Sequence, residues 1–428
     1  MGSWIPIKAD SDFSLQNLPY GVFSTAADTD RRIGVAVGDH VLDLKAFARN
    51  GAFASLEKDF DVTLLEDPTL NRYATLGRGV HRKVRAFLQE ILAENTTLGN
   101  VLRDQSTLRS AAVIPIQLVN MHLPVSVGNY TDFFTTPHHA QNCTDIVRPG
   151  SKVPASFYNM PLGYSGRASS VIPSGTPVRR PRGQFVTSEQ QPKFGPCEKL
   201  DFEVEFAAVI GKGNDLGQPI DIKDAEEHIF GCVLLNDWSA RDIQMAESTP
   251  LGPFNGKNFS TSISPWIVTL DALEPFRTKS LRSNPLLPYL QDREDSVHDI
   301  AIDVHLQVDS EKYHLTRCNT KNTIFSFAQM LAHHTAGGCP MQPGDLIGTG
   351  TLSGGTQSEL GCFLEASWNG TRQCTANTKG GAESKSINRV WLQDGDIVQY
   401  TAKAQGKDGL GRVGFGECSG QILPSPYI

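Results

Sequence analysis

The sequence predicts a mainly β protein with some α-helix, divided into a small N-terminal and a large C-terminal domain. At 428 residues the chain exceeds the usual length of one domain. Apolar and polar residues alternate over short runs bounded by Gly, Pro and polar turn residues, which is typical of β-strands. The strands are many and short, with long connections and no internal repeat. This pattern favours a β-roll or a sandwich over a parallel sheet wound from βαβ units.

The first 120 residues are expected to form a β-rich domain decorated with helix. Residues 32–44 read as a hairpin that turns at Gly38-Asp39, because a Gly-Asp pair separates two β-prone runs. Apolar residues recur at helical spacing from Arg78 to Glu94 and predict a helix there. After Ile114-Pro115 the chain becomes richer in Gly, Pro and polar residues. We therefore place the domain boundary near residue 120 and assign 121–428 to the second domain.

The second domain alternates predicted strands with turn-rich segments. Residues 300–308 alternate cleanly and predict a strand whose polar face carries Asp303 and His305. The segment from Ala376 to Ser386 holds Gly380-Gly381 between polar residues and is expected to be an exposed loop.

Composition excludes several classes of protein. The formal net charge is -7 and there is no basic stripe, which argues against binding to nucleic acid. The eight cysteines include no C-x-x-C pair, which disfavours a zinc cluster or a disulfide framework and fits free thiols in a reducing compartment. No stretch approaches the roughly 20 apolar residues of a membrane span, and no signal-peptide pattern opens the chain. We expect a soluble cytoplasmic protein that binds neither nucleic acid nor membrane.

The most informative run is residues 200–211, LDFEVEFAAVIG. Strict alternation places Glu203 and Glu205 on one face of a strand, and Phe202, Val204 and Phe206 on the other. Adjacent carboxylates repel unless a cation lies between them or one keeps its proton, so the pair predicts a hard metal ion such as Mg²⁺ or Ca²⁺. The alternative is a half-exposed edge strand with solvated glutamates.

Four further segments place reactive side chains among glycines and aromatic residues. They are residues 128–139 with Asp132 and His139, 233–244 with Asp237, 252–261 with Lys257, and 348–355, which is followed by Glu365. Taken singly, these side chains could be turn caps or surface charges. The glycine-rich run at 348–355 lacks the G-K-[ST] ending of a phosphate loop, so a nucleotide site is not expected.

In this order, the five segments resemble the fumarylacetoacetate hydrolase family. The likeness extends over essentially the whole chain and includes residues 10–13, 17–24, 163–170, 236–244, 262–266 and 412–418. The resemblance implies a small N-terminal SH3-like barrel, a large C-terminal mixed β-roll and homodimers formed through the large domain. It also implies a divalent metal, Ca²⁺ or Mg²⁺ with Mn²⁺ as a further option, and no organic cofactor.

The resemblance also assigns roles to individual residues of this chain. It implies that four carboxylates hold the metal, namely Asp132, Glu203, Glu205 and Asp237, and that Lys257 and Thr261 lie at a further cation site. It implies that His139 is the general base, oriented by Glu365, with transition-state donors Arg241, Gln244 and Lys257. The positions implied to contact substrate are Phe134, Arg148, Tyr164, Gln244, Ser248 and Thr351.

The implied reaction is hydrolysis of a carbon–carbon bond in a 1,3-diketone acid. In the family this is cleavage of fumarylacetoacetate to fumarate and acetoacetate, in the catabolism of tyrosine and phenylalanine. The expected partner is therefore a small dicarboxylic diketone.

Two departures from the family pattern leave the substrate open. The family has tyrosine at the positions of Phe134 and Ser248, so two phenol donors are missing here. A lost hydrogen bond to a charged group is worth about 1.5 to 3 kcal/mol. One alternative is therefore a relative with a changed pocket, acting on a bulkier diketone or as a decarboxylase or tautomerase. Another is a non-catalytic binding dimer, against which the full set of acids and the intact His139 and Glu365 argue.

Overall fold

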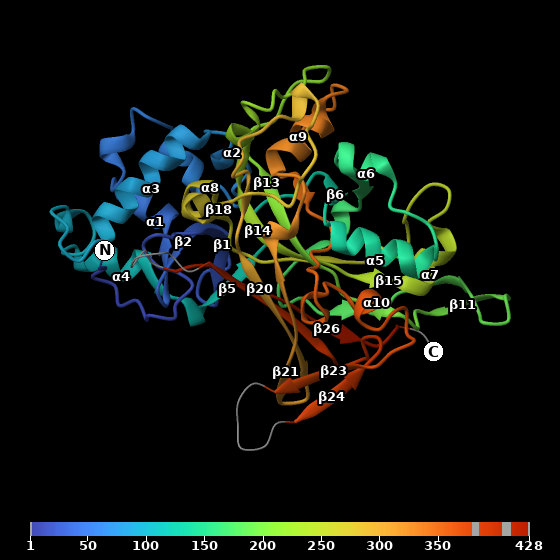
Figure 1. The fold of residues 1–428 in the computed structure, drawn as a ribbon. Helices are drawn as coiled ribbons and strands as arrows, with labels where there is room; N and C mark the ends of the chain where they lie inside the picture. Colours follow the sequence, from blue (N-terminus) through green and yellow to red (C-terminus); the bar gives the residue numbers. More distant parts are fainter. Residues whose placement is uncertain (1, 379–384, 405–411, 427–428) are drawn as a thin grey trace.

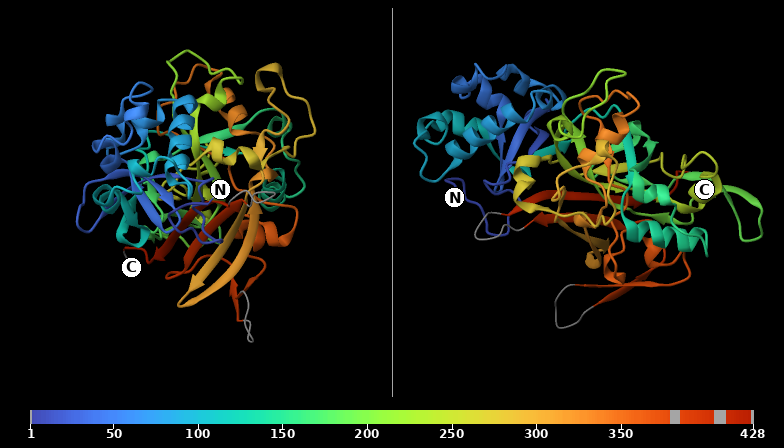
Figure 2. Two further views of the ribbon diagram at one scale, coloured as in Figure 1. Left: turned by 90° about the vertical axis from the view of Figure 1, so that its left-hand side faces the viewer. Right: turned by 45° about the horizontal axis from the view of Figure 1, so that its top comes forward.

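The computed structural model describes residues 2–378, 385–404 and 412–426. The N-terminal part of the chain lies on one side of the molecule, and the larger remainder is built around two stacked sheets (Figure 1). The second view confirms that the N-terminal part lies beside the sheets and does not wrap around them (Figure 2). The predicted fold class, mainly β with some helix in two regions, is confirmed.

An antiparallel sheet of order β4-β3-β2-β1-β5 forms the N-terminal part. Its strands are β1 (Tyr20–Thr25), β2 (Arg32–Val37), β3 (His40–Asp43), β4 (Val113–Pro115) and β5 (Val119–His122). Between β3 and β4 lie the helices α1 (Leu44–Arg49), α2 (Asn71–Ala74), α3 (Arg78–Leu92) and α4 (Ser106–Ala112). The predicted hairpin and the predicted helix are thus both present. Because β5 crosses position 120 and still pairs with β1, a division near that residue stays a prediction.

The central sheet of the large region runs β7-β6-β22-β13-β14-β16-β8, with β17 also paired to β14. Its strands are β6 (Tyr130–Phe134), β7 (Leu162–Gly166), β8 (Val171–Pro173), β13 (Val204–Ile210), β14 (Ile229–Asp237), β16 (Thr261–Ile263), β17 (Val268–Thr269) and β22 (Leu346–Gly348). Strands β13 and β14 are buried along their whole length. That burial explains why residues 206–210 read as an uninterrupted apolar run.

A second sheet, of order β24-β23-β21-β20-β25-β26-β9, packs against the central one. Its strands are β9 (Val178–Arg179), β20 (Ala301–Val308), β21 (Glu311–Asn319), β23 (Cys374–Thr378), β24 (Ser386–Arg389), β25 (Ile397–Ala404) and β26 (Val413–Leu423). The strand predicted at 300–308 is confirmed as β20. The expected loop at 376–386 is bounded by the paired strands β23 and β24, while Gly380 and Gly381 lie outside the described residues.

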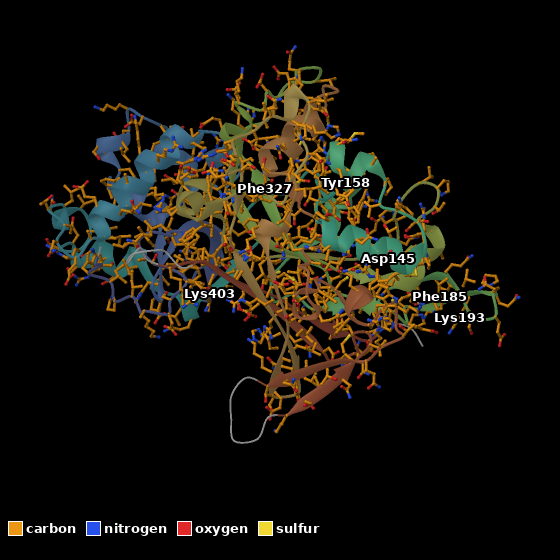
Figure 3. All side chains as sticks on the ribbon, in the orientation of Figure 1. Asp145, Tyr158, Phe185, Lys193, Phe327 and Lys403 are labelled. Atoms are coloured by element: carbon orange, nitrogen blue, oxygen red, sulfur yellow. The ribbon has the colours of Figure 1, made fainter. Side chains whose placement is uncertain are left out.

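Short elements connect and decorate these sheets. The helices are α5 (Pro137–Val147), α6 (Ala155–Asn159), α7 (Arg241–Glu247), α8 (Leu270–Leu273), α9 (Phe327–Thr335) and α10 (Phe363–Ala366). The short paired strands are β10 (Arg182–Val186) with β11 (Pro192–Pro196), β12 (Leu200–Asp201) with β15 (Ser239–Ala240), and β18 (Arg277–Thr278) with β19 (Val297–His298). The β10–β11 hairpin projects from the body, and Lys193 of β11 lies opposite Phe185 of β10, with its ammonium 5.4 Å from the Phe185 ring centre (Figure 3).

The two faces of β13 enter different cores. Phe206, Ala208 and Ile210 pack with apolar residues of the second sheet, whereas Ala207 and Val209 pack with the N-terminal part. The apolar face predicted for residues 202–206 is confirmed, because Phe202, Val204 and Phe206 all join the first of these cores. Regular strand structure begins only at Val204, so Phe202 and Glu203 lie in the short link between β12 and β13. Glu203 and Glu205 therefore point away from that core, at the end of the central sheet.

Candidate functional site

Three strands of the central sheet bring acidic side chains to one of its ends. Asp132 lies on β6, Glu205 on β13 and Asp237 at the end of β14, and oxygens of the three lie within 4.8 Å of one another. Each of the three side chains is at most 4% exposed. Gly348 of β22 makes room for them, since a Cβ there would lie 2.9 Å from Glu205 Oε2 and 3.3 Å from Asp132 Oδ1. The carboxylates thus converge in a buried space that a side chain at position 348 would fill.

Two cations balance part of this negative charge. The buried Lys257 ammonium donates to Glu203 and to Asp237. Arg241, at the start of α7, donates from Nη2 to Glu203 Oε1 over 2.8 Å and from Nε to Asp201 Oδ2 over 2.9 Å. A protonated ammonium has no lone pair to give a metal, so Lys257 is placed here as a counter-charge.

Glu205 and Asp132 are left without sufficient partners. Among the described residues, neither oxygen of Glu205 nor Asp132 Oδ1 has a hydrogen-bond partner. Burial, together with the negative charge of Asp237, raises the pKa of Asp132 to about 8. Burial and the charges of Asp132 and Asp237 raise the pKa of Glu205 well above its ordinary value. Hard divalent cations bind carboxylate oxygens. The buried oxygens without partners at Glu205 and Asp132 could therefore hold such an ion.

A second group lies beside the carboxylates, where α5 meets α10. His139 Nδ1 lies 2.7 Å from Glu365 Oε2, and both side chains are at most 4% exposed. Glu365 also accepts hydrogen bonds from Ser353 Oγ at 2.7 Å and Asn142 Nδ2 at 2.8 Å. These contacts fix the carboxylate and direct His139 Nδ1 toward it, which leaves Nε2 as the nitrogen able to take up a proton.

The charges around His139 decide its protonation. Burial lowers the pKa of His139, but its electrostatic and hydrogen-bond interactions with Cys143 and Glu365 outweigh burial and raise this pKa well above its ordinary value. Burial raises the pKa of Glu365, whereas the opposite charge of His139 and its hydrogen bonds outweigh this and lower it to about 2. The pair therefore stabilises an imidazolium next to a carboxylate.

A cavity of about 590 Å³ joins the two groups. The resemblance-assigned residues that line it are Asp132, Phe134, His139, Tyr164, Glu203, Glu205, Arg241, Gln244, Ser248, Lys257 and Thr351. The helices that contribute to it, α5, α7 and α10, lie close together on the right in Figure 1. The fold thus brings assigned residues from distant segments of the chain into one cavity.

Four assigned residues do not line this cavity. Glu365 and Asp237 lie directly behind it, bonded to lining residues. Thr261 is buried in β16, where its backbone pairs with Asp237. Arg148 is exposed at the end of α5. The role of Arg148 in binding substrate and the role of Thr261 in a further cation site stay predictions.

The two family departures have structural consequences. The ring of Phe134 packs edge-on against His139, with centroids 5.3 Å apart and planes at 71°. Ser248, which follows α7, donates to the backbone oxygen of Gln244 one turn earlier, so its hydroxyl is already engaged. Neither residue offers the phenol donor that the resemblance implies at its position.

Sequence reasoning missed Asp201, which connects the site's parts. Its Oδ1 accepts from the backbone of Phe363 at 2.7 Å, and its Oδ2 accepts from Leu364 at 2.8 Å and from Arg241 Nε at 2.9 Å. The next residue after Leu364 is Glu365, so one buried carboxylate positions both the cavity arginine and the helix that carries Glu365. In the sequence, Asp201 is one more polar residue of the alternating run at 200–211. That pattern gives no sign of its contacts with Arg241 and α10.

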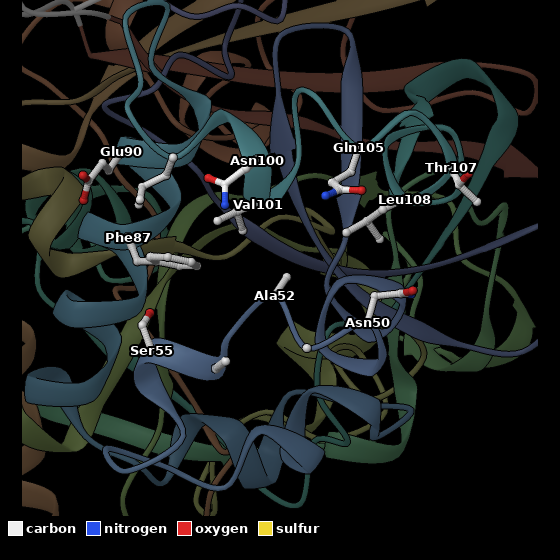
Figure 4. Close-up of a pocket in the computed structure, with 13 residues that line it drawn as sticks. Asn50, Ala52, Ser55, Phe87, Glu90, Asn100, Val101, Gln105, Thr107 and Leu108 are labelled. Atoms are coloured by element: carbon white, nitrogen blue, oxygen red, sulfur yellow. The ribbon is translucent and has the colours of Figure 1, made fainter.

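A larger cavity of about 790 Å³ lies in the N-terminal part (Figure 4). Its lining includes Phe87, Leu108, Asn100, Gln105 and Glu90 and none of the assigned residues. With one acid and no cation in its lining, it lacks the converging charges of the first cavity.

No described helix is long and apolar enough to cross a membrane.

Comparisons with known proteins identify relatives along the whole chain. Residues 16–124 match the model described as fumarylacetoacetase N-terminal, and residues 129–422 match fumarylacetoacetate (FAA) hydrolase C-terminal. The chain is 45% identical over 430 residues to the fumarylacetoacetase of Arabidopsis thaliana and 44% identical over 428 residues to that of Homo sapiens, with 99% of each chain covered. The fumarylacetoacetase fahA of Aspergillus fumigatus is 46% identical over 436 residues, again with 99% of both chains covered.

A solved structure shows the same fold at low identity. The putative HpcE protein from Mycobacterium smegmatis has a TM-score of 0.50 at 18% identity, with 94% of this chain and 99% of that chain covered. At this identity the likeness concerns the fold alone.

Proposed function

This chain belongs to the fumarylacetoacetate hydrolase family, and from that premise we propose that it hydrolyses fumarylacetoacetate to fumarate and acetoacetate. The observation that carries the proposal is the single cavity that joins a buried carboxylate cluster to a His–Glu pair. Hydrolysis of a 1,3-diketone needs both a group that stabilises an enolate and a base that activates water.

We propose that Asp132, Glu203, Glu205 and Asp237 hold a divalent metal, Mg²⁺ or Ca²⁺ by the hardness of the ligands. The unpartnered oxygens of Glu205 and Asp132 support this assignment. When bound, the metal would polarise the substrate carbonyls and stabilise negative charge on the departing enolate. Lys257 and Thr261 would contribute to a further cation site only if the ammonium of Lys257 left Glu203 and Asp237.

In its neutral form, His139 is proposed to remove a proton from water at Nε2, while Glu365 accepts a hydrogen bond from Nδ1 and stabilises the imidazolium that forms. The resulting hydroxide adds to a carbonyl carbon of the diketone. The carbon–carbon bond then breaks, the added oxygen stays in the carboxylic acid product, and the enolate takes up a proton to become the ketone. Each atom of the water molecule is accounted for by the two products.

Donors in the cavity wall would receive the negative charge that develops on oxygen. Arg241 and Lys257 line the cavity with their charges fixed by buried carboxylates, and Gln244 lies one turn from Arg241 on α7. Such preorganised donors stabilise a transition state because they need not reorient when charge develops. Tyr164, which donates to Asp237 Oδ2 over 3.1 Å, and Thr351 complete the polar wall.

A second candidate substrate is favoured by Phe134, Ser248 and Arg148. The first two lack the family's phenol groups, and Arg148 is exposed outside the cavity lining. A diketone with a bulkier or less acidic tail would suit such a pocket.

We also propose a cytoplasmic homodimer. The free cysteines support the compartment, and the exposed Leu251 and Phe254 beside the cavity residue Pro253 support the dimer.

Steady-state kinetics test the proposal. Fumarylacetoacetate and diketones with neutral or larger tails are compared on the purified protein, after chelation and after addition of Mg²⁺, Ca²⁺ or Mn²⁺. The proposal expects the highest kcat/KM with fumarylacetoacetate and loss of turnover on chelation. A preference for another diketone would favour the second candidate, and full turnover in chelator would contradict the role of the metal.

A further inference from the structure

Two cysteine side chains contact the His139–Glu365 pair from different elements. Cys143 lies one turn after His139 on α5, with its Sγ 3.4 Å from Nε2 and 3.8 Å from Nδ1. Cys362 immediately precedes α10, and its Sγ lies 3.1 Å from Glu365 Oε2. The sequence gives no paired cysteine spacing, so this group is assembled by the fold alone.

Three of these side chains have ligand atoms close enough together to share one metal ion. One ring nitrogen of His139, a Glu365 oxygen and the Cys362 sulfur lie within 4.8 Å of one another. The Cys143 sulfur lies outside this set of three but 3.8 Å from Nδ1, from where a change of its rotamer would bring it in as a fourth ligand. In a tetrahedral zinc site, metal–ligand bonds of about 2.0 to 2.3 Å place neighbouring ligand atoms roughly 3.3 to 3.8 Å apart. The Nδ1–Oε2 distance of 2.7 Å lies below that range, so these two atoms would have to move apart to admit an ion.

The chemistry of this group differs from that of the carboxylate cluster. Asp132, Glu205 and Asp237 offer only oxygen, which suits Mg²⁺ and Ca²⁺, whereas two thiols and an imidazole suit Zn²⁺. His139, Glu365 and Cys362 are buried, and the half-buried Cys143 lines the cavity. From solvent, the cavity therefore reaches His139 and Cys143, whereas Glu365 and Cys362 lie behind its wall.

We propose that His139, Glu365, Cys143 and Cys362 form a second, inhibitory metal site that binds Zn²⁺. The ion takes the place of the hydrogen between His139 Nδ1 and Glu365 Oε2, and both thiols release their protons to solvent. An imidazole coordinated through Nδ1 keeps its hydrogen on Nε2, so it can no longer accept a proton from water. The inhibition rests on the proposed function of His139, but the binding of zinc does not.

Cobalt absorption tests the binding separately from activity. The protein is first saturated with Mg²⁺ to occupy the carboxylate cluster and is then titrated with Co²⁺. Thiolate ligands give cobalt a charge-transfer band in the near ultraviolet that oxygen ligands do not give. We expect this band at one Co²⁺ per chain, with loss of the band when Zn²⁺ displaces the cobalt.

Single substitutions assign the band to these sulfurs. Cys362→Ser and Cys143→Val should each weaken Co²⁺ binding about tenfold or more. Cys339→Ser, at another half-buried cysteine outside the group, should bind as the native protein does. Circular dichroism identifies a variant that fails to fold, and if Cys362→Ser fails, Cys143→Val carries the test. No band in the native protein, or an unchanged band in the folded variants, would overturn the site.

Turnover in the presence of zinc then tests the inhibitory role. Fumarylacetoacetate cleavage is measured at saturating Mg²⁺, and the inhibition should follow the same Zn²⁺ concentration dependence as displacement of cobalt. Zinc binding without loss of turnover would overturn the inhibitory role and would also contradict His139 as the base. A missing cobalt band would instead overturn only the zinc site and would leave the proposed function standing.

Discussion

His139 and Glu365 are 226 positions apart in the chain, yet His139 Nδ1 lies 2.7 Å from Glu365 Oε2 in a buried pair. A carboxylate at this distance fixes which ring nitrogen carries the hydrogen and stabilises the protonated ring. The chemistry proposed for this chain depends on that contact, and so do most of the predictions that follow.

Replacing His139 tests the base directly. His139→Ala should lower kcat by about 10²- to 10⁴-fold, because removal of a general base withdraws the proton acceptor from the water-activating step. Binding of Mg²⁺ or Ca²⁺, measured by calorimetry, should persist, since His139 is not among the carboxylates that would hold the ion. His138→Ala, at the neighbouring histidine of α5, is the matched control. A similar loss of turnover in both variants would point to a disturbed helix and not to a lost base.

Neutralising Glu365 should move the pH profile. Because the negative charge of Glu365 raises the pKa of His139, Glu365→Gln should lower that pKa. Only the neutral form of His139 can accept a proton, so the acid limb of kcat/KM follows the pKa of His139. This limb should therefore shift to lower pH by about one pH unit or more. The maximal rate should fall because the imidazolium loses its partner. An unchanged acid limb would show that another group limits the rate in acid.

Asp201 is predicted to act as a positioning residue. Asp201→Asn should lower kcat by about 10²-fold with a smaller change in KM, since it loosens Arg241 and the backbone that leads to Glu365. Asp345→Asn is a matched control, because Asp345 is also buried and accepts from backbone amides of Asn129 and Gln342 away from the cavity. If both variants lost the same amount of stability and the same factor in kcat, the effect of Asp201 would be purely structural.

Glu205 is expected to destabilise the metal-free protein. Glu205→Gln replaces a carboxyl whose charged form is disfavoured by burial and by Asp132 and Asp237, so it should raise the melting temperature measured in chelator. The same change should weaken divalent-metal binding on the order of 10²-fold or more and abolish the stabilisation that added Mg²⁺ gives the native protein. Scanning calorimetry with and without metal measures both effects. If added metal left the melting temperature of the native protein unchanged, this would contradict the assignment of the carboxylates as metal ligands.

Restoring the missing phenols tests the pocket. If both positions limit the reaction, Phe134→Tyr combined with Ser248→Tyr should raise kcat/KM for fumarylacetoacetate about tenfold to a hundredfold, because each phenol can donate to a charged substrate group. The single variants show whether the two hydroxyl groups act together. Unchanged kinetics in the double variant would mean that these positions do not limit the native enzyme.

Local patterns in the sequence predicted the parts of the site that lie on one strand or helix. Alternation at 202–206 placed Glu203 and Glu205 opposite Phe202, Val204 and Phe206, and the structure confirms the apolar side of that pattern. Both strands of the hairpin at 32–43 and the helix at 78–92 also follow from periodicity and turn residues.

Contacts between distant segments could not be predicted in this way. The approach of His139 to Glu365 was expected only from the family resemblance, because no local period relates α5 to α10. Asp201, Cys143 and Cys362 were missed for the same reason: each is an ordinary residue in its own segment, and its environment arises from tertiary packing. Exposure of Arg148 likewise depends on where α5 ends, which the sequence does not specify.

Product analysis tests the central claim most directly. Purified protein with Mg²⁺ is incubated with fumarylacetoacetate, and the products are identified and quantified by nuclear magnetic resonance, with His139→Ala in parallel. We predict fumarate and acetoacetate in equal amounts from the native protein and only trace amounts of either from the variant. Persistence of the substrate with the folded native protein, or its conversion to an isomer or a decarboxylated ketone, would contradict the assignment of hydrolysis.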